Sequence, residues 1–228
     1  MSGDKIALST RERQAQQKRK QILTASITLF EKKCIEDTSI EEIAKHAGVG
    51  AATVYRYFST KIELVIETAG HYWEQVAEKY LTELELPEAD FSKKRSGYQQ
   101  LEQILHIFCQ IFEEEKAFLK FLQEFDVFVK KYEISKEGLA DYEDGILKLK
   151  PYVTNALETG LEDRSLTFSC SVDEMYFSLT HTLLSLMEKL AVGGDILTSD
   201  QMVEGNVQLQ VMTRLILKGL TQNGSDYE

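Results

Sequence analysis

Helix breakers are almost absent from this chain, and that scarcity constrains its fold more than any other feature. Only two prolines, Pro87 and Pro151, occur in 228 residues. The long segments are rich in Leu, Glu, Lys, Gln and Ala, which tolerate helix well. No stretch alternates apolar and polar residues over the length of a strand. The sequence therefore predicts an all-α protein.

Charge is divided unevenly along the chain. The net charge is −11, but residues 1–61 hold 11 Lys and Arg against 7 Asp and Glu, whereas residues 62–228 hold 15 against 30. A basic first quarter joined to an acidic remainder indicates a module at the N-terminal end that faces nucleic acid.

Other classes of protein are disfavoured. No apolar run reaches the roughly 18 residues of a membrane span, and the N-terminus lacks the apolar region of a signal peptide. Cys34, Cys109 and Cys170 lie far apart without metal-ligand spacing, so we expect buried, reduced thiols in a cytoplasmic protein. We expect no metal, no cofactor and no membrane partner.

A first helix is predicted within "TRERQAQQKRKQILTASITLFEKK". Its apolar stripe at helical spacing consists of Ile22, Ala25, Ser26, Leu29 and Phe30. Upstream of the stripe we expect exposed basic residues, namely Arg11, Arg13, Lys18, Arg19 and Lys20. They fit a solvated helix start, but cations there oppose the helix dipole, and a phosphate partner would remove that conflict.

Two short helices are predicted next. Ser39 and Glu42 form a capping-box pattern, so a second helix should start at Ile40. Its inner face would be Ile40, Ile43, Ala44 and Ala47. Gly48 then supplies the left-handed position that ends it. In "GAATVYRYF" Val54 and Phe58 would point inward, with Ala52, Thr53, Tyr55 and Arg56 outward. Two short helices joined by a glycine turn and packed on a third make a helix-turn-helix.

The opening and outer face of the third helix carry the chemistry of a DNA contact. Gly50, Ala51 and Ala52 allow close approach at a helix N-terminus, where free N–H groups attract anions. Thr53, Tyr55 and Tyr57 can donate hydroxyl hydrogen bonds to phosphate. Arg56 can reach phosphate or guanine, and Lys61 is a further phosphate candidate. Packing of Tyr57 on the first helix, and a merely solvated Lys61, are the alternatives.

The segment "TSIEEIAKHAGVGAATVYRYFSTKIEL", preceded by "KRKQILTASITLFEKK", resembles the DNA-binding domain of tetracycline-repressor-type (TetR/AcrR) transcriptional regulators. The resemblance covers about residues 15–65. It implies DNA contacts at Thr38, Ser39, Gly50, Ala51, Ala52, Thr53, Tyr55, Arg56, Tyr57 and Lys61. The chain departs from the family pattern at Cys34 and Ala52, where glycine is usual, and at Gly50, where a capping serine is common.

Beyond residue 61, periodicity predicts six helices at about 61–84, 96–113, 115–132, 139–160, 171–192 and 202–220, with Pro151 a candidate kink in the fourth of them. We expect a flexible basic arm at 1–14, a helix-turn-helix DNA-binding domain at 15–62, a helical effector-binding and dimerisation domain at 63–222, and a flexible tail at 223–228.

The resemblance also implies a homodimer, formed through the last two helices as a four-helix bundle. Independently, apolar residues recur at helical spacing in these helices: Val172, Met175, Leu179, Leu183, Leu186, Leu190, Val207, Val211 and Leu215. Ordinary core packing is the alternative for each of them. Two half-sites double the readout available to one short helix.

Aromatic residues are frequent in the middle of the chain. Most of them fill the core, and the remainder would suit a cavity for a small apolar or aromatic effector. The candidate effector-binding residues are Trp73, Phe108, Phe112, Phe125, Phe128, Tyr152, Asn155, Tyr176 and His181. No nucleophile elbow, phosphate-binding glycine loop or paired metal motif is present, so nothing supports an enzyme.

The sequence thus predicts a dimeric DNA-binding transcriptional regulator, a repressor, that binds a palindromic operator and is released or altered by an effector. By the family resemblance, the effector would move the helix at about 61–84 and change the separation of the two recognition helices. A ligand-independent DNA-organising factor, or a helical binding protein that retains the motif, is the alternative; a helical enzyme is the weakest option.

Overall fold

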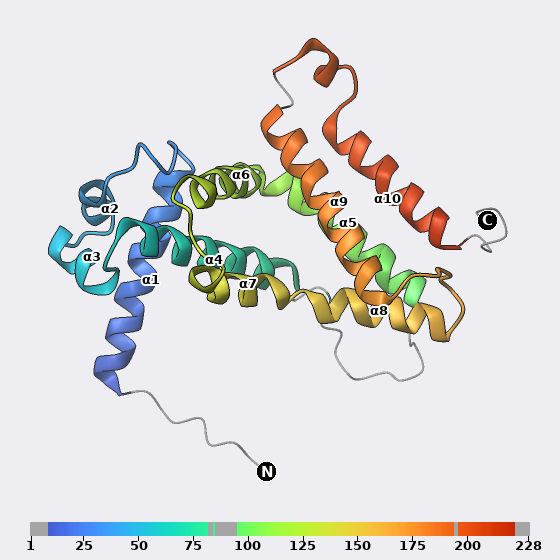
Figure 1. Ribbon diagram of the computed structural model, residues 1–228, viewed down its shortest axis with the longest axis horizontal. Helices are drawn as coiled ribbons and strands as arrows, with labels where there is room; N and C mark the ends of the chain where they lie inside the picture. Colours follow the sequence, from blue (N-terminus) through green and yellow to red (C-terminus); the bar gives the residue numbers. More distant parts are fainter. Residues whose placement is uncertain (1–8, 82–83, 85–94, 194–195, 222–228) are drawn as a thin grey trace. The chain divides into compact units, whose positions relative to one another are not determined.

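The computed structural model describes residues 9–81, 84, 95–193 and 196–221 (Figure 1). Ten α-helices and two short 3-10 helices form the regular structure of these ranges, which contain no strand. The prediction of an all-α protein is confirmed. Within the same ranges, no helix is long and apolar enough to cross a membrane.

The helices belong to two compact units. The first comprises residues up to 72 together with 124–142, and the second comprises 73–123 together with the residues from 143 onward. This division differs from the predicted boundary at residue 62, because residues 63–72 and 124–142 pack in the same unit as the helix-turn-helix. The predicted tail at 223–228 lies outside the described residues.

The N-terminal unit is built on the predicted helix-turn-helix. Its helices are α1 (Thr10–Phe30), α2 (Ile40–His46), α3 (Ala51–Tyr57), the first part of α4 (Lys61–Leu81) and the second part of α6 (Lys116–Lys131). Fully buried apolar side chains fill its centre, among them Ile22, Ile43, Val54, Phe58 and Leu64. Gly48 has φ +63°, the left-handed conformation predicted for the residue that ends the second helix.

The start of α1 corrects one prediction. Ser9 caps the helix, because its hydroxyl accepts a hydrogen bond from the Glu12 N–H and the Glu12 carboxylate accepts one from the Ser9 N–H. Residues 10–14 are therefore helical and are not part of a flexible arm. The capping box explains why the helix begins so early. Residues 1–8 of the predicted arm lie outside the described residues.

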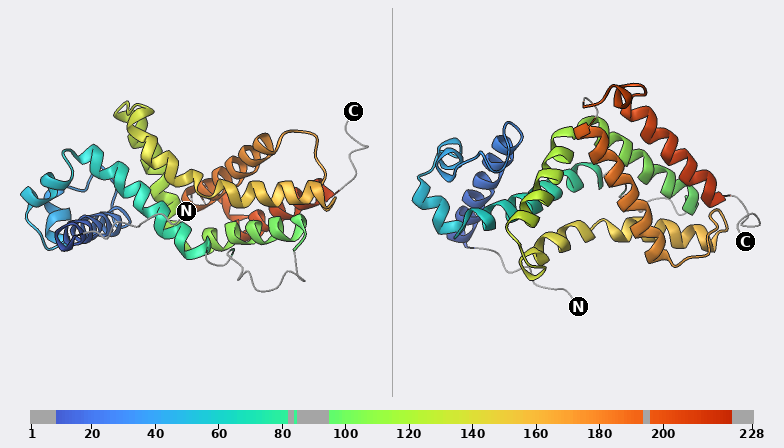
Figure 2. Two further views of the ribbon diagram at one scale, coloured as in Figure 1. Left: turned by 90° about the horizontal axis from the view of Figure 1, so that it is seen from below. Right: turned by 45° about the horizontal axis from the view of Figure 1, so that its top comes forward.

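The C-terminal unit contains α5 (Gly97–Glu114), α8 (Lys150–Glu162), α9 (Val172–Gly193) and α10 (Gly205–Thr221). α10 contacts both α5 and α9, and the connection from α9 to α10 carries the 3-10 helix η3 (Thr198–Gln201) (Figure 2). α5 packs on α8 very closely, because a Cβ atom on Gly97 would lie 2.0 Å from the Gly160 nitrogen. Only glycine permits that approach of two backbones.

The helix predicted at 139–160 is wrong as a single element. The structure has a 3-10 helix η2 (Glu137–Leu139), then α7 (Ala140–Leu147) and α8 as separate helices. Pro151 does not kink a helix but lies in the first turn of α8, where its missing N–H has no helical partner to lose. The helix predicted at 61–84 ends at Leu81, and residues 82–83 lie outside the described residues.

The three cysteines are free thiols, but the prediction that they are buried is wrong. Cys34 and Cys170 are exposed and Cys109 is half-buried, and all three are free. Cys34 lies in the connection between α1 and α2, and Cys170 lies two residues before α9 begins at Val172. Cys34 and Cys170 are therefore exposed because they lie in connections between helices.

Candidate nucleic-acid interface

α2 begins at the predicted capping box. The Ser39 hydroxyl accepts from the Glu42 N–H at 3.2 Å, and the Glu42 carboxylate accepts from the Ser39 N–H at 2.9 Å. Lys33 forms an ion pair with Glu42 at 2.5 Å. The hydrogen bond from Lys33, followed by those from Ser39, lowers the pKa of Glu42 to about 2. The N-terminus of α2 is therefore fixed by a carboxylate that stays ionised.

α3 presents one side to the surface and buries the other. Val54 and Phe58 point inward as predicted, with no more than 1 % of their surface exposed, whereas Tyr55 is 50 % exposed. Ala52 and Arg56 are exposed as well. Gly50 is the N-cap and supplies no side-chain hydrogen bond to the helix. The Thr53 N–H donates to the Gly50 carbonyl at 2.8 Å, whereas the N–H groups of Ala51 and Ala52 receive no side-chain cap.

Of the three predicted hydroxyl donors on α3, Tyr55 is exposed, whereas Thr53 and Tyr57 are half-buried. The Arg56 guanidinium lies 5.3 Å from the centre of the Tyr57 ring. This cation–π contact holds the two side chains together on one side of the helix end.

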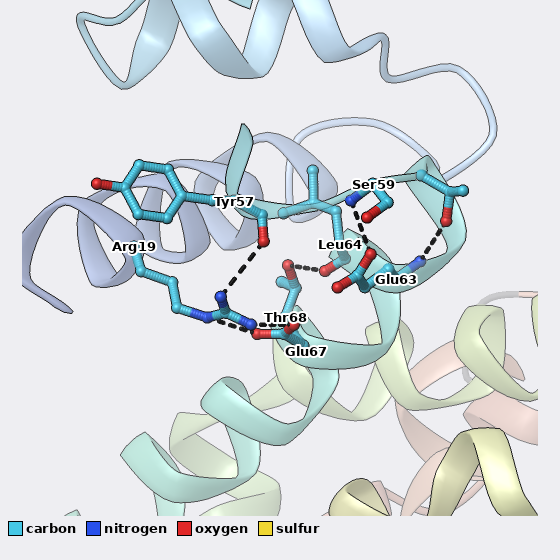
Figure 3. Close-up of polar contacts among 8 residues, drawn as sticks. Arg19, Tyr57, Ser59, Glu63, Leu64, Glu67 and Thr68 are labelled. Atoms are coloured by element: carbon cyan, nitrogen blue, oxygen red, sulfur yellow. Dashed lines mark hydrogen bonds and ion pairs between the residues drawn. The ribbon is translucent and has the colours of Figure 1, made fainter. Parts of the chain in front are cut away.

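Arg19 of α1 contacts the C-terminal end of α3 and the first part of α4 (Figure 3). Its guanidinium donates to the Tyr57 carbonyl at 3.3 Å and forms a two-pronged ion pair with Glu67 of α4. The same guanidinium lies 4.8 Å from the centre of the Phe58 ring. Arg19 was predicted to be one of the exposed basic residues, and this is wrong: it joins α1, α3 and α4.

Lys61, the predicted phosphate lysine, already has a partner. Its ammonium donates to the Glu36 carbonyl at 3.0 Å, and burial lowers its pKa from the ordinary value. The Glu36 carboxylate is held in turn by Lys131 at 2.8 Å and by the Tyr132 hydroxyl at 3.1 Å. An ammonium carries three N–H donors, so the bond to Glu36 leaves Lys61 able to contact a phosphate as well.

The predicted contacts at the start of α2 do not hold for the side chains. Thr38 is 1 % exposed, and its hydroxyl donates to the Cys34 carbonyl at 3.1 Å. The Ser39 hydroxyl is engaged with Glu42 in both directions. Thr38 therefore orders the connection between α1 and α2, because a buried hydroxyl needs an internal partner.

Sequence reasoning missed residues that hold this surface together. Gln21 of α1 donates to the Ala47 carbonyl at the end of α2, at 2.7 Å. Glu124 of α6 accepts from the Ile35 N–H at 3.0 Å. These partners lie 26 and 89 residues apart, so no local pattern marks them.

The candidate effector residues do not form one group. Phe125 and Phe128 belong to the N-terminal unit, where their rings lie 4.8 Å from Tyr142 and 4.5 Å from Tyr132. The others belong to the C-terminal unit: Trp73, Phe108, Phe112, Tyr152, Asn155, Tyr176 and His181. The structure therefore divides the predicted set between two cores.

Within the C-terminal unit, burial separates the candidates further. Trp73, Phe112 and Tyr176 are buried, and Trp73 packs edge-on against Phe118 at 4.8 Å. Asn155 and His181 are exposed. Buried aromatic rings in edge-on contact are ordinary core packing. Trp73, Phe112 and Tyr176 therefore agree with the expectation that most of the aromatic residues fill the core.

The fold and the surface together define a helix-turn-helix protein. Residues 22–68 match the family described as "Bacterial regulatory proteins, tetR family". Over this segment, which is about a fifth of the chain, the protein is similar to the TetR/AcrR family of transcriptional regulators.

Individual relatives are similar over the same region. The transcriptional repressor KstR of Mycolicibacterium smegmatis is 32 % identical over 63 residues, 28 % of this chain and 31 % of that protein. The transcriptional regulator AcrR of Shigella flexneri is 37 % identical over 75 residues, 33 % of each chain. The matched segments thus span about a third of these relatives.

The whole fold has counterparts among solved structures. The transcriptional regulator FadR from Bacillus subtilis, solved in complex with stearoyl-CoA, aligns with a TM-score of 0.60 at 15 % identity. The alignment covers 88 % of this chain and 98 % of that one. At this identity the likeness concerns the fold alone.

Proposed function

We propose that this protein is a DNA-binding transcriptional regulator, a repressor, that binds a palindromic operator as a dimer. The exposed face of α3 carries the proposal: Tyr55 and Arg56 project outward, Val54 and Phe58 fix the helix from inside, and Arg19 holds its end. A short helix held this firmly can keep its side chains in register with base edges in the major groove.

The proposed contacts have distinct roles. Gly50, Ala51 and Ala52 allow the backbone to approach phosphate closely, and Thr53, Tyr55, Tyr57 and Lys61 donate to phosphate oxygens. Arg56 reads a base, because a guanidinium can pair with guanine through two hydrogen bonds. The side chains of Thr38 and Ser39 are left out of this set, since both are engaged within the protein.

A homodimer through α9 and α10 is the proposed functional unit. Val207, Val211 and Leu215 are exposed at 42 %, 43 % and 57 %. They recur every four residues on the side of α10 opposite its buried residues Leu209, Thr213 and Leu217. A regular apolar stripe on the outside of a helix is typical of a protein–protein contact.

The proposed effector is a small apolar or aromatic molecule that binds the C-terminal unit. α4 contributes residues to both units, up to Tyr72 in one and from Trp73 in the other. An effector that changes the position of α4 would therefore also move Glu67, which forms an ion pair with Arg19. A coupling free energy of about 1–3 kcal/mol suffices for an allosteric switch.

Selection of bound sites from random double-stranded DNA tests the proposal. We expect an enriched palindrome whose half-sites are spaced by about one helical turn or a multiple of it. Recovery of no consensus, or of a site without dyad symmetry, would refute an operator-specific dimer. Selection repeated with an acyl-CoA and an aromatic acid present tests the effector; unchanged enrichment across such a panel would favour a ligand-independent DNA-binding factor.

A further inference from the structure

The first three turns of α1 bury no side chain, although Arg19 at their end contacts α3 and α4. No residue of α1 before Ile22 is buried. This part also lies outside the family match, which starts at residue 22. A helical stretch of this length without buried side chains is only marginally stable by itself, so binding of a partner to its basic side chains would stabilise it.

Helical geometry divides the cations of this stretch into two stripes. Successive residues turn by about 100° around an α-helix, so residues seven apart share a face. Arg11 and Lys18 therefore lie on one stripe, which we call the turn-side stripe, together with Gln14 and Gln21. Arg13 and Lys20 lie on another, which we call the far stripe. Arg19 belongs to neither, because it is bound to Glu67.

Hydrogen bonds connect the turn-side stripe to the helix-turn-helix. The Lys18 ammonium donates to the Gln21 side-chain oxygen at 3.0 Å. The Gln21 side-chain nitrogen donates to the Ala47 carbonyl at 2.7 Å. Ala47 is the C-cap of α2 and directly precedes Gly48, so this stripe adjoins the turn that leads into α3.

The cations of the turn-side stripe lack an internal counter-charge. Neither Arg11 nor Lys18 forms an ion pair with any carboxylate in the part of the chain that the structure describes, whereas Arg19 does. Arg11 also lies in the first turn of α1, where a cation opposes the helix dipole. An external anion would relieve both conflicts, in a chain whose net charge is −11.

We propose that Arg11, Gln14 and Lys18 form an additional contact with the DNA backbone. The phosphates they bind flank those reached by α3. The contact adds affinity and salt dependence without adding sequence preference, because phosphates carry no sequence information. This inference rests on the proposed function, since it requires the turn between α2 and α3 to face DNA.

The far stripe supplies a matched control. Arg11→Gln/Lys18→Gln and Arg13→Gln/Lys20→Gln each remove one Arg and one Lys from the same helix. The affinity of the full-length protein for a duplex selected from random DNA is measured by fluorescence anisotropy across a salt series. Helix content by circular dichroism confirms that both variants keep α1.

Counterion release sets the expected result. Each lost phosphate contact lowers the slope of log affinity against log salt concentration by about 0.9. We expect Arg11→Gln/Lys18→Gln to lower the slope of a dimer by about 3–4, with an unchanged site preference, and Arg13→Gln/Lys20→Gln to leave it near that of the wild type.

Three results would overturn the inference. Equal losses in both variants would mean that only overall charge matters, and no loss in either would mean that α1 does not touch DNA. Failure of the wild-type protein to bind any duplex would remove the proposed function itself, and the inference with it. The first two results leave the proposed function intact, so the two failures are distinguishable.

Discussion

Arg19 links the C-terminal end of α3 to α1 and α4. One guanidinium binds the Tyr57 carbonyl, the Glu67 carboxylate and the face of Phe58. The planar fork of arginine suits this role, because it satisfies a carboxylate with two hydrogen bonds and keeps a further N–H free. Lysine could not make the same set of contacts.

Replacing either partner of this ion pair should destabilise the protein. Because the pair is partly exposed, we expect Arg19→Gln and Glu67→Gln to cost about 1 kcal/mol each, which corresponds to a fall in Tm of about 2–4 °C. The double variant should lose less than the sum of the two. Lys148→Gln serves as the control, since its pair with Glu74 is more exposed; equal losses at both pairs would contradict the anchoring role.

Glu42 makes the start of α2 sensitive to acid. Its pKa is lowered to about 2 in the folded protein, so its contribution to stability is present above its unfolded pKa and is lost as the pH falls towards 2. The difference in Tm between wild type and Glu42→Gln should therefore be largest near neutral pH and disappear in strong acid. A difference that grew on acidification would have the wrong sign.

At the level of elements, local signals were enough to predict the helix-turn-helix. The capping box of Ser39 and Glu42, the left-handed Gly48 and the spacing of Val54 and Phe58 all act within a few residues. The long-range contacts were not predictable in this way. Arg19 meets Glu67 across 48 positions and Glu36 meets Lys131 across 95, and no periodicity encodes such pairs.

The break between α7 and α8 was missed for a related reason. Apolar periodicity continues through residues 139–160, so a single helix was predicted there. Pro151 was assigned to a kink, although proline is also common in the first turn of a helix, where the structure has it. Which side of α3 is exposed was predictable from the local pattern, whereas the division of the candidate effector residues between two units was not. Aromatic residues look alike in sequence whether they fill a core or line a cavity.

The crossing of α5 and α8 gives a prediction at the same scale. Gly97→Ala would bring a Cβ atom to 2.0 Å from the Gly160 nitrogen, so the two helices must separate, at a cost of about 1–3 kcal/mol. Gly70→Ala is the control, because nothing lies within 4 Å of its Cβ position and helix propensity favours alanine by about 1 kcal/mol. Thermal unfolding should show Tm changes of opposite sign; a tolerated Gly97→Ala would contradict the close approach.

For the whole molecule, the central structural expectation is a dimer. Charge on the α10 stripe should break it, because Val211→Glu/Leu215→Glu places four carboxylates in one apolar contact. Light scattering should change from about twice the chain mass of 26.1 kDa to the mass of a single chain. Gln210→Glu, exposed on the same helix, should remain dimeric, and a double variant that also remained dimeric would place the interface elsewhere.

The most direct test of the whole account is the affinity of a Tyr55→Ala/Arg56→Ala variant for a duplex selected by the wild type. We expect affinity to fall by about 10- to 1,000-fold, since base contacts are worth about 1–3 kcal/mol each. Arg56→Lys should keep the charge but relax the preference at one base pair. If the double variant bound the duplex as tightly as the wild type, the assignment of α3 as the DNA-reading helix would be contradicted.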